Sequence, residues 1–508
     1  MYERFVRSAT EGKGSPLSFQ CKKEGEYRVE KTVLKEKVKS FFSAHVLELF
    51  LSITCVTILF VLFLFWKKEQ GSLSGASLNA AVLSAALFAT LGVIFVFKWF
   101  NEFRNSEKFS GDAKAFGDDK GFGDRANMLI VYLSLLAVSF CVLLLVWVLQ
   151  CVFVRNMGFG DSLNIWRQLD SQHYIHIADH WYAFGGFSEE TLGNDVRIAF
   201  FPGYPVLIKT VKLLTFGLVD TFTCSMFISI NMFAGAGCML YRLMRLDYSK
   251  DEALRSVLFF CLIPGAFFFI APMSESLFLF VTLASIYFSR RGNYFLGSLF
   301  GFYAAFTRSL GIIVLVPVIY ELILRTIKEK PSGRSAVIRR LGDFALPLLI
   351  IPCGLLAYLL LNYKVTGDAF TFLDAQKNHW GQEISYFFNT ASYQVKYFAD
   401  YIEGGRSSVA FALWGMGSCA LFGTLAVLIL GARKMRASYL GYSMVYFVIS
   451  MGATWLLSAP RYAAGLFSLP VALALITKNR VIQGILTILF VVIYIIYATM
   501  FVMRWQVW

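Results

Sequence analysis

Charged residues are scarce in this sequence. Only 16% of its 508 residues are Asp, Glu, Lys or Arg, whereas a soluble domain has about 25%. Hydrophobic residues make up 57% of the chain, and the mean hydropathy is +0.60. Apolar runs long enough to cross a bilayer recur from end to end. The composition therefore excludes a soluble globular protein and predicts an all-α membrane protein with many spans.

Cysteine motifs are also absent, since no Cys-x-x-Cys pair occurs. Eight of the nine cysteines lie in or at apolar runs, and Cys21 lies in the polar N-terminal segment. Such cysteines are typical of small buried side chains rather than of metal ligands. The chain also lacks an aromatic and basic module of the kind that binds single strands, so no nucleic-acid partner is expected. We attribute the formal charge of +14 to basic loops between spans.

Two targeting and processing signals are missing. The first 40 residues are polar, and the first apolar run is too long for the core of a cleavable signal peptide. We expect that run to be a signal anchor. No Asn-x-Ser/Thr sequon occurs, which weakly favours a prokaryotic origin and the cell membrane. A eukaryotic origin would instead place the protein in the ER membrane.

The apolar runs predict about eleven to thirteen transmembrane helices. Several runs are shorter than the ~20 residues that a span needs, which indicates half-helices or re-entrant segments. We predict three parts: a polar tail at 1–43, an extra N-terminal hairpin with a flexible loop at 44–126, and the main membrane domain at 127–508. The runs lie at about 44–66, 77–99, 128–154, 221–244, 253–271, 273–289, 293–307, 309–325, 341–363, 408–431, 437–457, 460–477 and 480–502.

Two long polar loops, 155–220 and 364–407, interrupt the main domain. Short loops rich in Lys and Arg mark the cytoplasmic side of a membrane protein, and here they lie near 242–255, 290–291, 325–340 and 433–436. This bias predicts a cytoplasmic N-terminus and puts both long loops on the extracytoplasmic face. Four of the five histidines lie in those loops, so we expect the polar chemistry there.

The first long loop opens with an aromatic, histidine-rich stretch that contains Asp170. Read as a helix, this stretch places Asp170, His173 and Tyr174 on one face. A carboxylate at the mouth of a helix bundle is a candidate general base, so Asp170 is the predicted catalytic residue. The alternative is an interfacial helix anchored by its aromatic side chains. His176 and His180 have no third ligand at a fixed spacing, so no metal site is predicted.

Ionisable residues also interrupt later apolar runs, at Glu275, Arg308 and Arg461. A charged side chain at such depth is costly and is a functional candidate. An arginine near the outer surface suits a phosphate, which it binds with paired charge-assisted hydrogen bonds. The alternative is that Glu275 forms a structural ion pair with Arg308 or Arg461.

Two loop segments add prolines, aromatic residues and amides. The prolines, glycine and aromatic residues of 197–205 predict a rigid turn where the first loop re-enters the membrane. The segment 366–381 offers carboxylates, amides and aromatic rings, which are typical of a sugar site. An ordinary interfacial helix is the alternative for this second segment.

In this order along the chain, these motifs resemble those of the PIG-V family of mannosyltransferases. The chain departs from the family pattern at Leu169, Trp181 and Ala369, where the pattern has Trp, Gly and Pro. Residues 1–125 resemble no part of it. The matching segments are Asp170 to Tyr174, Ile177-Ala178, Tyr182, Ala199 to Pro205, Ser274 to Phe278, Thr307 to Gly311, Gly367-Asp368, Ala375-Gln376, Trp380-Gly381 and Pro460-Arg461-Tyr462.

The resemblance implies a GT-C type membrane glycosyltransferase. Such an enzyme would move a mannose-type sugar, with inversion, from a polyprenyl phosphate donor to a lipid-linked or glycan acceptor. Asp170 would be its catalytic base. The implied substrate-binding residues are His173, Tyr174, Phe201, Pro202, Tyr204, Glu275, Arg308, Asp368, Gln376, Trp380 and Arg461.

A lipid-phosphate leaving group needs no bridging metal, so we expect no metal and no other cofactor. Expected partners are membrane lipids, the donor, the acceptor and a small membrane subunit. One alternative is a GT-C transferase that acts on a protein or a wall polymer. Another is a transporter or lipid flippase, although transporters usually show internal repeats and short polar loops, whereas this chain shows no convincing repeat and has motifs in two long loops.

Overall fold

The computed structural model describes residues 44–105, 122–182 and 196–507. The chain divides into two compact units, Met1–Ile58 and Leu59–Trp508. In the described part of the first unit, helix α3 (Val46–Gln70) begins, and His45 Nδ1 lies 3.0 Å from Oε1 of Glu48. The predicted polar tail at 1–43 and most of the predicted flexible loop lie outside the described residues.

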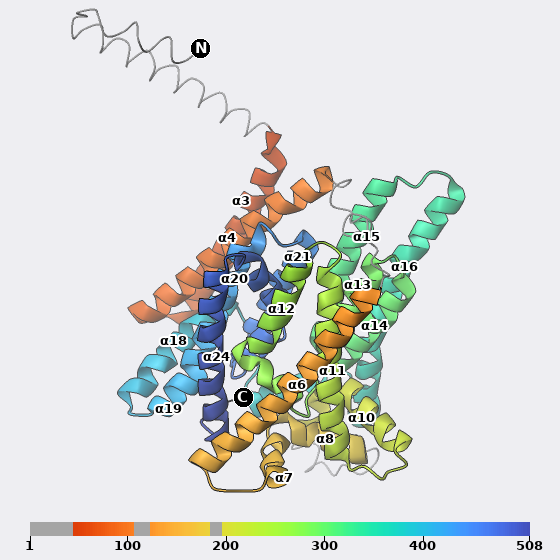
Figure 1. Cartoon of the computed structure of the whole chain (residues 1–508). Helices are drawn as coiled ribbons and strands as arrows, with labels where there is room; N and C mark the ends of the chain where they lie inside the picture. The colour runs from red at the N-terminus through yellow and green to blue at the C-terminus, as the bar shows by residue number, and fades with distance from the viewer. Residues whose placement is uncertain (1–43, 106–121, 183–195, 508) are drawn as a thin grey trace, which may run out of the picture. The chain divides into compact units, whose positions relative to one another are not determined.

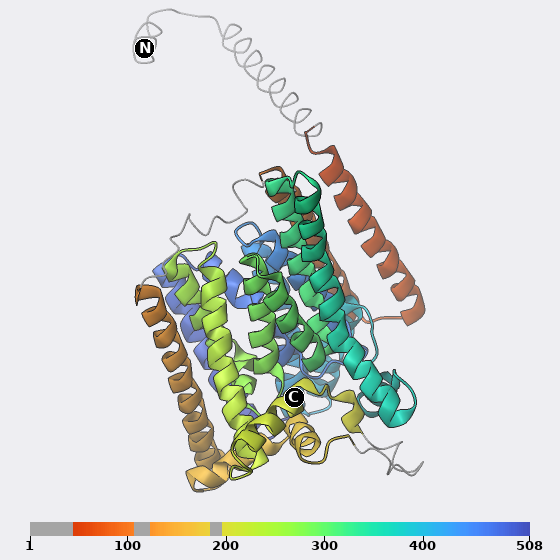
Figure 2. The ribbon, with the colours of Figure 1, turned by 90° about the vertical axis from the view of Figure 1, so that its right-hand side faces the viewer.

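The described part of the second unit consists of helices joined by turns and loops (Figures 1 and 2). The described part of the chain has no β-strand, and its isolated bridge joins Ile384 to Ala453. After α3 the helices are α4 (Gly75–Arg104), α6 (Phe122–Phe153), α7 (Phe159–Ser162), η1 (Leu163–Arg167), α8 (Asp170–His180), η2 (Val196–Ala199), α10 (Gly203–Leu214), α11 (Thr221–Met244), α12 (Lys250–Leu262), η3 (Pro264–Ile270), α13 (Glu275–Arg290), α14 (Tyr294–Thr307), η4 (Ser309–Val314), α15 (Leu315–Glu329), α16 (Arg334–Thr366), α17 (Thr371–Trp380), α18 (Phe387–Glu403), α19 (Ser407–Val409), η5 (Ala410–Gly415), α20 (Met416–Ala432), α21 (Ala437–Met451), α22 (Ala459–Ala464), α23 (Ser468–Ile476) and α24 (Arg480–Val502).

Eight of the described helical segments are long and apolar enough to cross a membrane. A ninth would be α12 with η3, which bend by 82° at Ile263, because Pro264 cannot continue the hydrogen bonding of α12. This finding confirms an all-α polytopic membrane protein. The predicted eleven to thirteen spans exceed this number, because several predicted runs form shorter helices, such as α13 with 16 residues and α14 with 14.

Helices α11, α13 and α23 form the interior of the second unit, and nearly all side chains of α13 and α23 are buried. Helices α6, α16 and α24 expose many large apolar side chains, as expected for surfaces that face lipid. Two glycines allow unusually close packing against α14. A Cβ atom on Gly311 would lie 2.1 Å from the carbonyl carbon of Ala304, and one on Gly354 would lie 2.1 Å from the carbonyl oxygen of Phe302.

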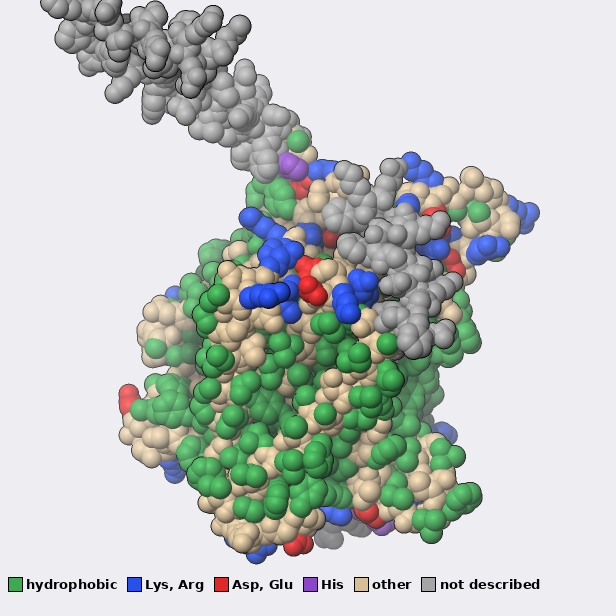
Figure 3. Space-filling model, in the orientation of Figure 1, with side chains coloured by type: hydrophobic (Ala, Val, Ile, Leu, Met, Phe, Trp, Pro, Cys, Tyr) green, Lys and Arg blue, Asp and Glu red, His purple; other side chains and the backbone are tan. Residues whose placement is uncertain are grey.

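One end of the second unit carries a buried ionic cluster. Nη2 of Arg290 donates to Asp247 Oδ1 at 2.8 Å, and Arg436 donates from Nε and Nη2 to the two oxygens of Glu321 at 2.6 and 2.7 Å. Arg436 also donates to Asp247 Oδ1 at 3.2 Å. Three of the predicted basic loops therefore meet at this end, where Figure 3 shows Lys and Arg above a band of hydrophobic side chains.

The segments that contain Asp170 lie at the opposite end of the second unit. Both ribbon views show α7, α8 and α10 gathered there, far from the connection between α15 and α16 (Figures 1 and 2). The basic loops and the first long loop are thus at opposite ends of the bundle. The assignment of these ends to the cytoplasm and the exterior stays a prediction.

Candidate active site

Asp170 is the first residue of α8. The preceding Leu169 has φ 58°, a left-handed conformation that is rare for a residue with a branched side chain. This turn separates η1 from α8 and starts the new helix at the carboxylate. A negative charge in the first turn of a helix is stabilised by the helix dipole. The side chain of Asp170 keeps 28% of its surface exposed, so it is accessible as well as held.

Arg461 joins Asp170 to the buried Glu275. Its Nη2 donates to Oδ2 of Asp170, and its Nε donates to Oε1 of Glu275 at 2.6 Å. Nη1 of Arg308 donates to the same Glu275 oxygen at 2.5 Å. Four side chains therefore form a row of alternating charge in the order Asp170, Arg461, Glu275 and Arg308, which we call the ionic row.

Burial within the ionic row is greatest at its centre. Glu275 and Arg461 are 5% and 6% exposed, Arg308 is 16% exposed and Asp170 is 28% exposed. Buried ions are tolerated when they are paired and hydrogen-bonded, and here two carboxylates balance two guanidinium groups. Glu275 therefore forms ion pairs with both arginines, as the alternative interpretation predicted. The carboxylate of Asp170 at the end of the row stays accessible.

One glycine allows a close backbone approach beside Arg461. A Cβ atom on Gly265 would lie 2.3 Å from the carbonyl oxygen of Pro460. The absence of a side chain there lets η3 pack directly against the start of α22, which carries Arg461. The Arg461 guanidinium also lies 5.8 Å from the ring centre of Phe268, so η3 supports the arginine from a second direction.

Tyr174 and Ser274 connect Arg308, at one end of the ionic row, back to α8. The Tyr174 hydroxyl lies 2.8 Å from Oγ of Ser274, and Arg308 Nη1 donates to that same Oγ at 3.2 Å. Burial raises the pKa of Tyr174 well above its ordinary value, so its hydroxyl stays protonated and can act as a neutral hydrogen-bond donor.

Aromatic rings from both long loops meet beside α8. The ring of Phe200 stacks on His173, with centroids 4.6 Å apart, and contacts Trp380 edge-on at 5.9 Å. Phe200 also contacts the Tyr174 ring at 5.1 Å. Since Trp380 ends α17, this contact brings the two predicted loops together. We call His173, Phe200 and Trp380 the aromatic wall.

Three of the predicted substrate-binding residues make mainly protein contacts. Phe201 stacks on Tyr358 at 3.8 Å, and it is buried in a small cluster with Phe372. The Tyr204 hydroxyl is buried and donates to the carbonyl oxygen of Ser225 at 2.8 Å. Pro202 precedes α10 and is also buried. These contacts brace the turn, and a role in substrate binding stays a prediction for all three.

Asp368 and Gln376 lie near and within α17. Oδ1 of Asp368 accepts from the backbone N–H of Phe370 at 2.9 Å, so this carboxylate stabilises the turn before the helix. Gln376 is half-buried within α17. Among the described residues, no hydrogen bond joins either side chain to the ionic row, and their predicted contacts with substrate stay predictions.

Sequence reasoning missed several residues of this site. Ser274 was seen only as part of a motif, yet it links Tyr174 to Arg308. The Tyr462 ring, whose centre lies 5.7 Å from the Arg308 guanidinium, was not proposed as a site residue. The sequence signal for these two is their place in the matching motifs, next to Glu275 and Arg461.

The two histidines at the end of α8 lie side by side, with the ring centres of His176 and His180 4.5 Å apart. Within the ranges that the structure describes, no group of three His, Cys, Asp or Glu side chains could hold a metal ion. The described donors therefore offer the two histidines no third protein ligand.

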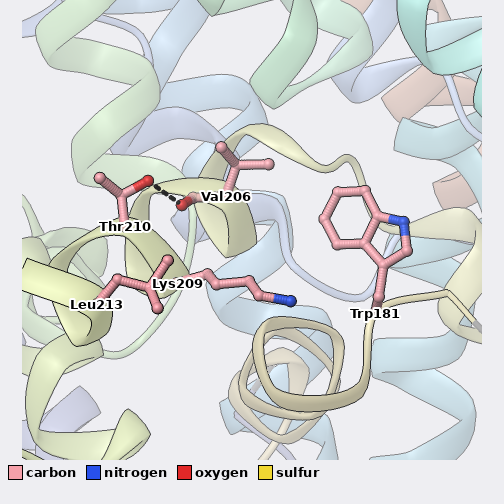
Figure 4. A pocket seen from close by; sticks show the side chains of 5 residues that line it. All are labelled: Trp181, Val206, Lys209, Thr210 and Leu213. Carbon is pink, nitrogen blue, oxygen red and sulfur yellow. Dashed lines mark hydrogen bonds between the residues drawn. The ribbon is translucent and has the colours of Figure 1, made fainter. Parts of the chain in front are cut away.

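A shallow groove lies between the end of α8 and α10 (Figure 4). It is lined by Trp181, Val206, Lys209, Thr210 and Leu213. The turn that follows α10 exposes large apolar side chains, including Phe216 at 90% and Leu218 at 88%. Aromatic, basic and apolar side chains together are typical of a segment at the membrane interface.

Comparison with known proteins gives one family and two weakly similar relatives. The family model described as Mannosyltransferase (PIG-V) matches residues 134–375. The GPI alpha-1,6-mannosyltransferase 2 of Mus musculus is 28% identical over 173 residues, which are 31% of this chain and 31% of that protein. The protein of the same name from Rattus norvegicus is 29% identical over 153 residues, 28% of this chain and 29% of its own length.

These matches confirm the resemblance that the motifs predicted, because residues 134–375 are similar to the PIG-V mannosyltransferase family. The alignments span only about a third of the length of the two relatives. The matched range contains Asp170, Glu275 and Arg308, whereas Arg461 lies beyond it. The ionic row therefore joins the family's segment to a part of the chain outside the match.

Proposed function

We propose that this chain, whose residues 134–375 match the PIG-V mannosyltransferase family, transfers a mannose-type sugar from a polyprenyl phosphate donor. The acceptor would be a hydroxyl of a lipid-linked molecule or a glycan. The observation that carries this proposal is the ionic row, which places an accessible carboxylate, Asp170, next to a buried guanidinium, that of Arg461. Sugar transfer from a phosphate needs a base and a cation of this kind close together.

In this mechanism Asp170 removes the proton from the acceptor hydroxyl. The oxygen of that hydroxyl attacks the anomeric carbon from the face opposite the phosphate, so the configuration inverts. The transition state has oxocarbenium character, and negative charge grows on the departing phosphate. Arg461 and Arg308 stabilise that charge, as fixed cations do in other group transfers. No metal or other cofactor takes part in these steps.

The aromatic wall gives the sugar a surface to lie on. His173, Phe200 and Trp380 present rings from two loops. Aromatic rings bind the apolar face of a sugar, and the hydroxyl groups at the edge of the sugar then stay free. Tyr174 remains protonated and is available to hold the row through Ser274. Predicted contacts of Asp368 and Gln376 with the acceptor would come from the same side, through α17.

We further propose that the reaction takes place on the extracytoplasmic face of the cell membrane, with the N-terminus in the cytoplasm. The site lies at the end of the bundle opposite the basic loops, and such loops usually remain in the cytoplasm. The apolar turn after α10 would lie in the outer interface, where a polyprenyl chain is available. A small membrane subunit is a further proposed partner.

A membrane assay with radiolabelled polyprenyl-phosphate mannose tests this function. Wild-type membranes should move label from the donor into a lipid or polymer fraction. Asp170→Asn should lower that transfer by about 10²–10⁴-fold, which is the usual contribution of a general base. Asp251→Asn is the matched control, because Asp251 is an exposed carboxylate in the first turn of α12, at the opposite end of the bundle. Near-full transfer by normally expressed Asp170→Asn would show that the assigned base is wrong.

A further inference from the structure

Arg461 has two tasks in the proposed function that compete with each other. In the structure its Nη2 is hydrogen-bonded to the carboxylate of Asp170. The proposed reaction also needs this arginine for the donor phosphate. While Nη2 donates to Asp170, that corner of the guanidinium is not available to a phosphate, and the carboxylate oxygen that accepts the bond is occupied. The base and the leaving group therefore both depend on the same cation.

The other side of the Arg461 guanidinium is fixed. Its Nε donates to Glu275 Oε1 at 2.6 Å, and Glu275 is held in turn by Arg308 at 2.5 Å. Both groups of the Glu275–Arg461 pair are about 95% buried. The backbone of α22 is also pressed against Gly265. Only the Nη end of Arg461, at the exposed edge of the row, can change its partner without breaking a buried contact.

The charges of the reaction favour such a change. The bond from the anomeric carbon to the acceptor oxygen forms, and the bond from that carbon to the phosphate oxygen breaks. The electron pair of the broken bond stays on the phosphate, and the acceptor proton moves to Asp170. One negative charge thus disappears from Asp170 while one appears on the phosphate. A cation that bonds to Asp170 before transfer is best placed on the phosphate after it.

We propose that Arg461 exchanges partners, leaving Asp170 for the phosphate of the donor while Glu275 and Arg308 hold its other side. Donor binding then frees the base, and the arrival of the proton on Asp170 keeps Arg461 on the leaving phosphate. The acceptor hydroxyl meets an active base only after the donor has bound. This inference rests on the proposed function and adds an order of events to it.

Binding of a polyprenyl monophosphate that carries no sugar tests the exchange without any transfer. If Asp170 competes for Arg461, then Asp170→Asn should bind this lipid about tenfold more tightly than wild type, since one charge-assisted hydrogen bond is gained without competition. The purified full-length protein in nanodiscs would be titrated with the fluorescent lipid. Polyprenol, which lacks the phosphate, should bind equally to both proteins, and Asp251→Asn should behave as wild type. Unchanged or weaker phosphate binding by Asp170→Asn would overturn the exchange.

A second variant separates the exchange from simple loss of charge repulsion. Removal of Asp170 relieves repulsion whether or not Arg461 is present, but it releases Arg461 only when that residue is there. In an Arg461→Gln background, Asp170→Asn should therefore tighten binding by no more than about twofold, within the range of additive behaviour. Equal gains in both backgrounds would refute the exchange.

Lipid binding and sugar transfer together distinguish a failure of the exchange from a failure of the proposed function. Loss of transfer with unchanged lipid binding would leave Asp170 as the base and remove the exchange. Tighter binding with intact transfer would keep the exchange and remove Asp170 as the base.

Discussion

Glu275 should matter far more for stability than Asp170, although both carboxylates belong to one ionic row. Glu275 is 5% exposed and accepts from both guanidinium groups through a single oxygen. Glu275→Gln keeps the shape of the side chain but leaves two buried cations near a neutral amide. Removal of one partner from a buried ion pair usually costs about 3–5 kcal/mol, and we expect a loss of that size in the free energy of unfolding.

Asp170→Asn is the internal comparison for this prediction. Asp170 is 28% exposed and lies at the end of the row, and Arg461 keeps its bond to Glu275 when Asp170 is neutral. Water also screens the exposed pair, so we expect a cost of about 1 kcal/mol or less. Thermal unfolding in detergent, followed by tryptophan fluorescence and by the monodisperse fraction on size exclusion, would rank the two variants.

A thermal unfolding midpoint of Glu275→Gln equal to that of Asp170→Asn would contradict this prediction. It would mean that water or rearranged side chains replace the lost ion pairs of the two arginines. Burial would then not determine how much each member of the ionic row contributes to stability. A low midpoint for Asp170→Asn alone would contradict it as well, because that result would make the exposed end the anchor.

Three further predictions concern other parts of the chain. Gly203→Ala should cost about 1–3 kcal/mol of stability by overpacking, because its Cβ would lie 2.4 Å from Oγ1 of Thr307; thermal unfolding would measure this. Trp380→Ala should raise KM for the donor about threefold to tenfold with a smaller effect on kcat, since a stacking contact contributes about 0.5–1.5 kcal/mol. Burial opposes the charge on Asp247, but the guanidinium of Arg290 outweighs it and lowers the pKa of that carboxyl. The stabilisation by Asp247 is therefore complete above the unfolded pKa of about 3.9 and is lost as pH falls through the folded pKa, so Asp247→Asn should weaken the acid dependence of the unfolding midpoint.

Much of the ionic row could be predicted because charge is expensive in an apolar chain. Glu275, Arg308 and Arg461 stand out from their surroundings, and the cost of burying them implies that they pair. Their order could not be predicted. The sharing of one Glu275 oxygen by two arginines depends on where α13 and α22 begin and where α14 ends, and those positions depend on packing between residues far apart in sequence.

The aromatic residues show where sequence reasoning ends. Phe200 and Phe201 are neighbours of the same type, but Phe200 joins the aromatic wall whereas Phe201 is buried against Tyr358. The direction of each ring is set by the backbone of a short turn, which no periodic pattern describes. The predicted number of spans is larger than the eight or nine long apolar segments among the described residues for a related reason. Apolar composition is equally compatible with a full span and with a short buried helix such as α13, and only the packing of the bundle separates the two.

We propose that Asp170 takes the proton in a sugar transfer and that donor binding does not require that carboxylate. The most direct test measures donor binding and sugar transfer on one preparation of Asp170→Asn in liposomes, with labelled polyprenyl-phosphate mannose. We predict that the variant gains donor affinity and loses transfer by at least about 100-fold. Transfer close to wild type at equal donor occupancy would contradict the account.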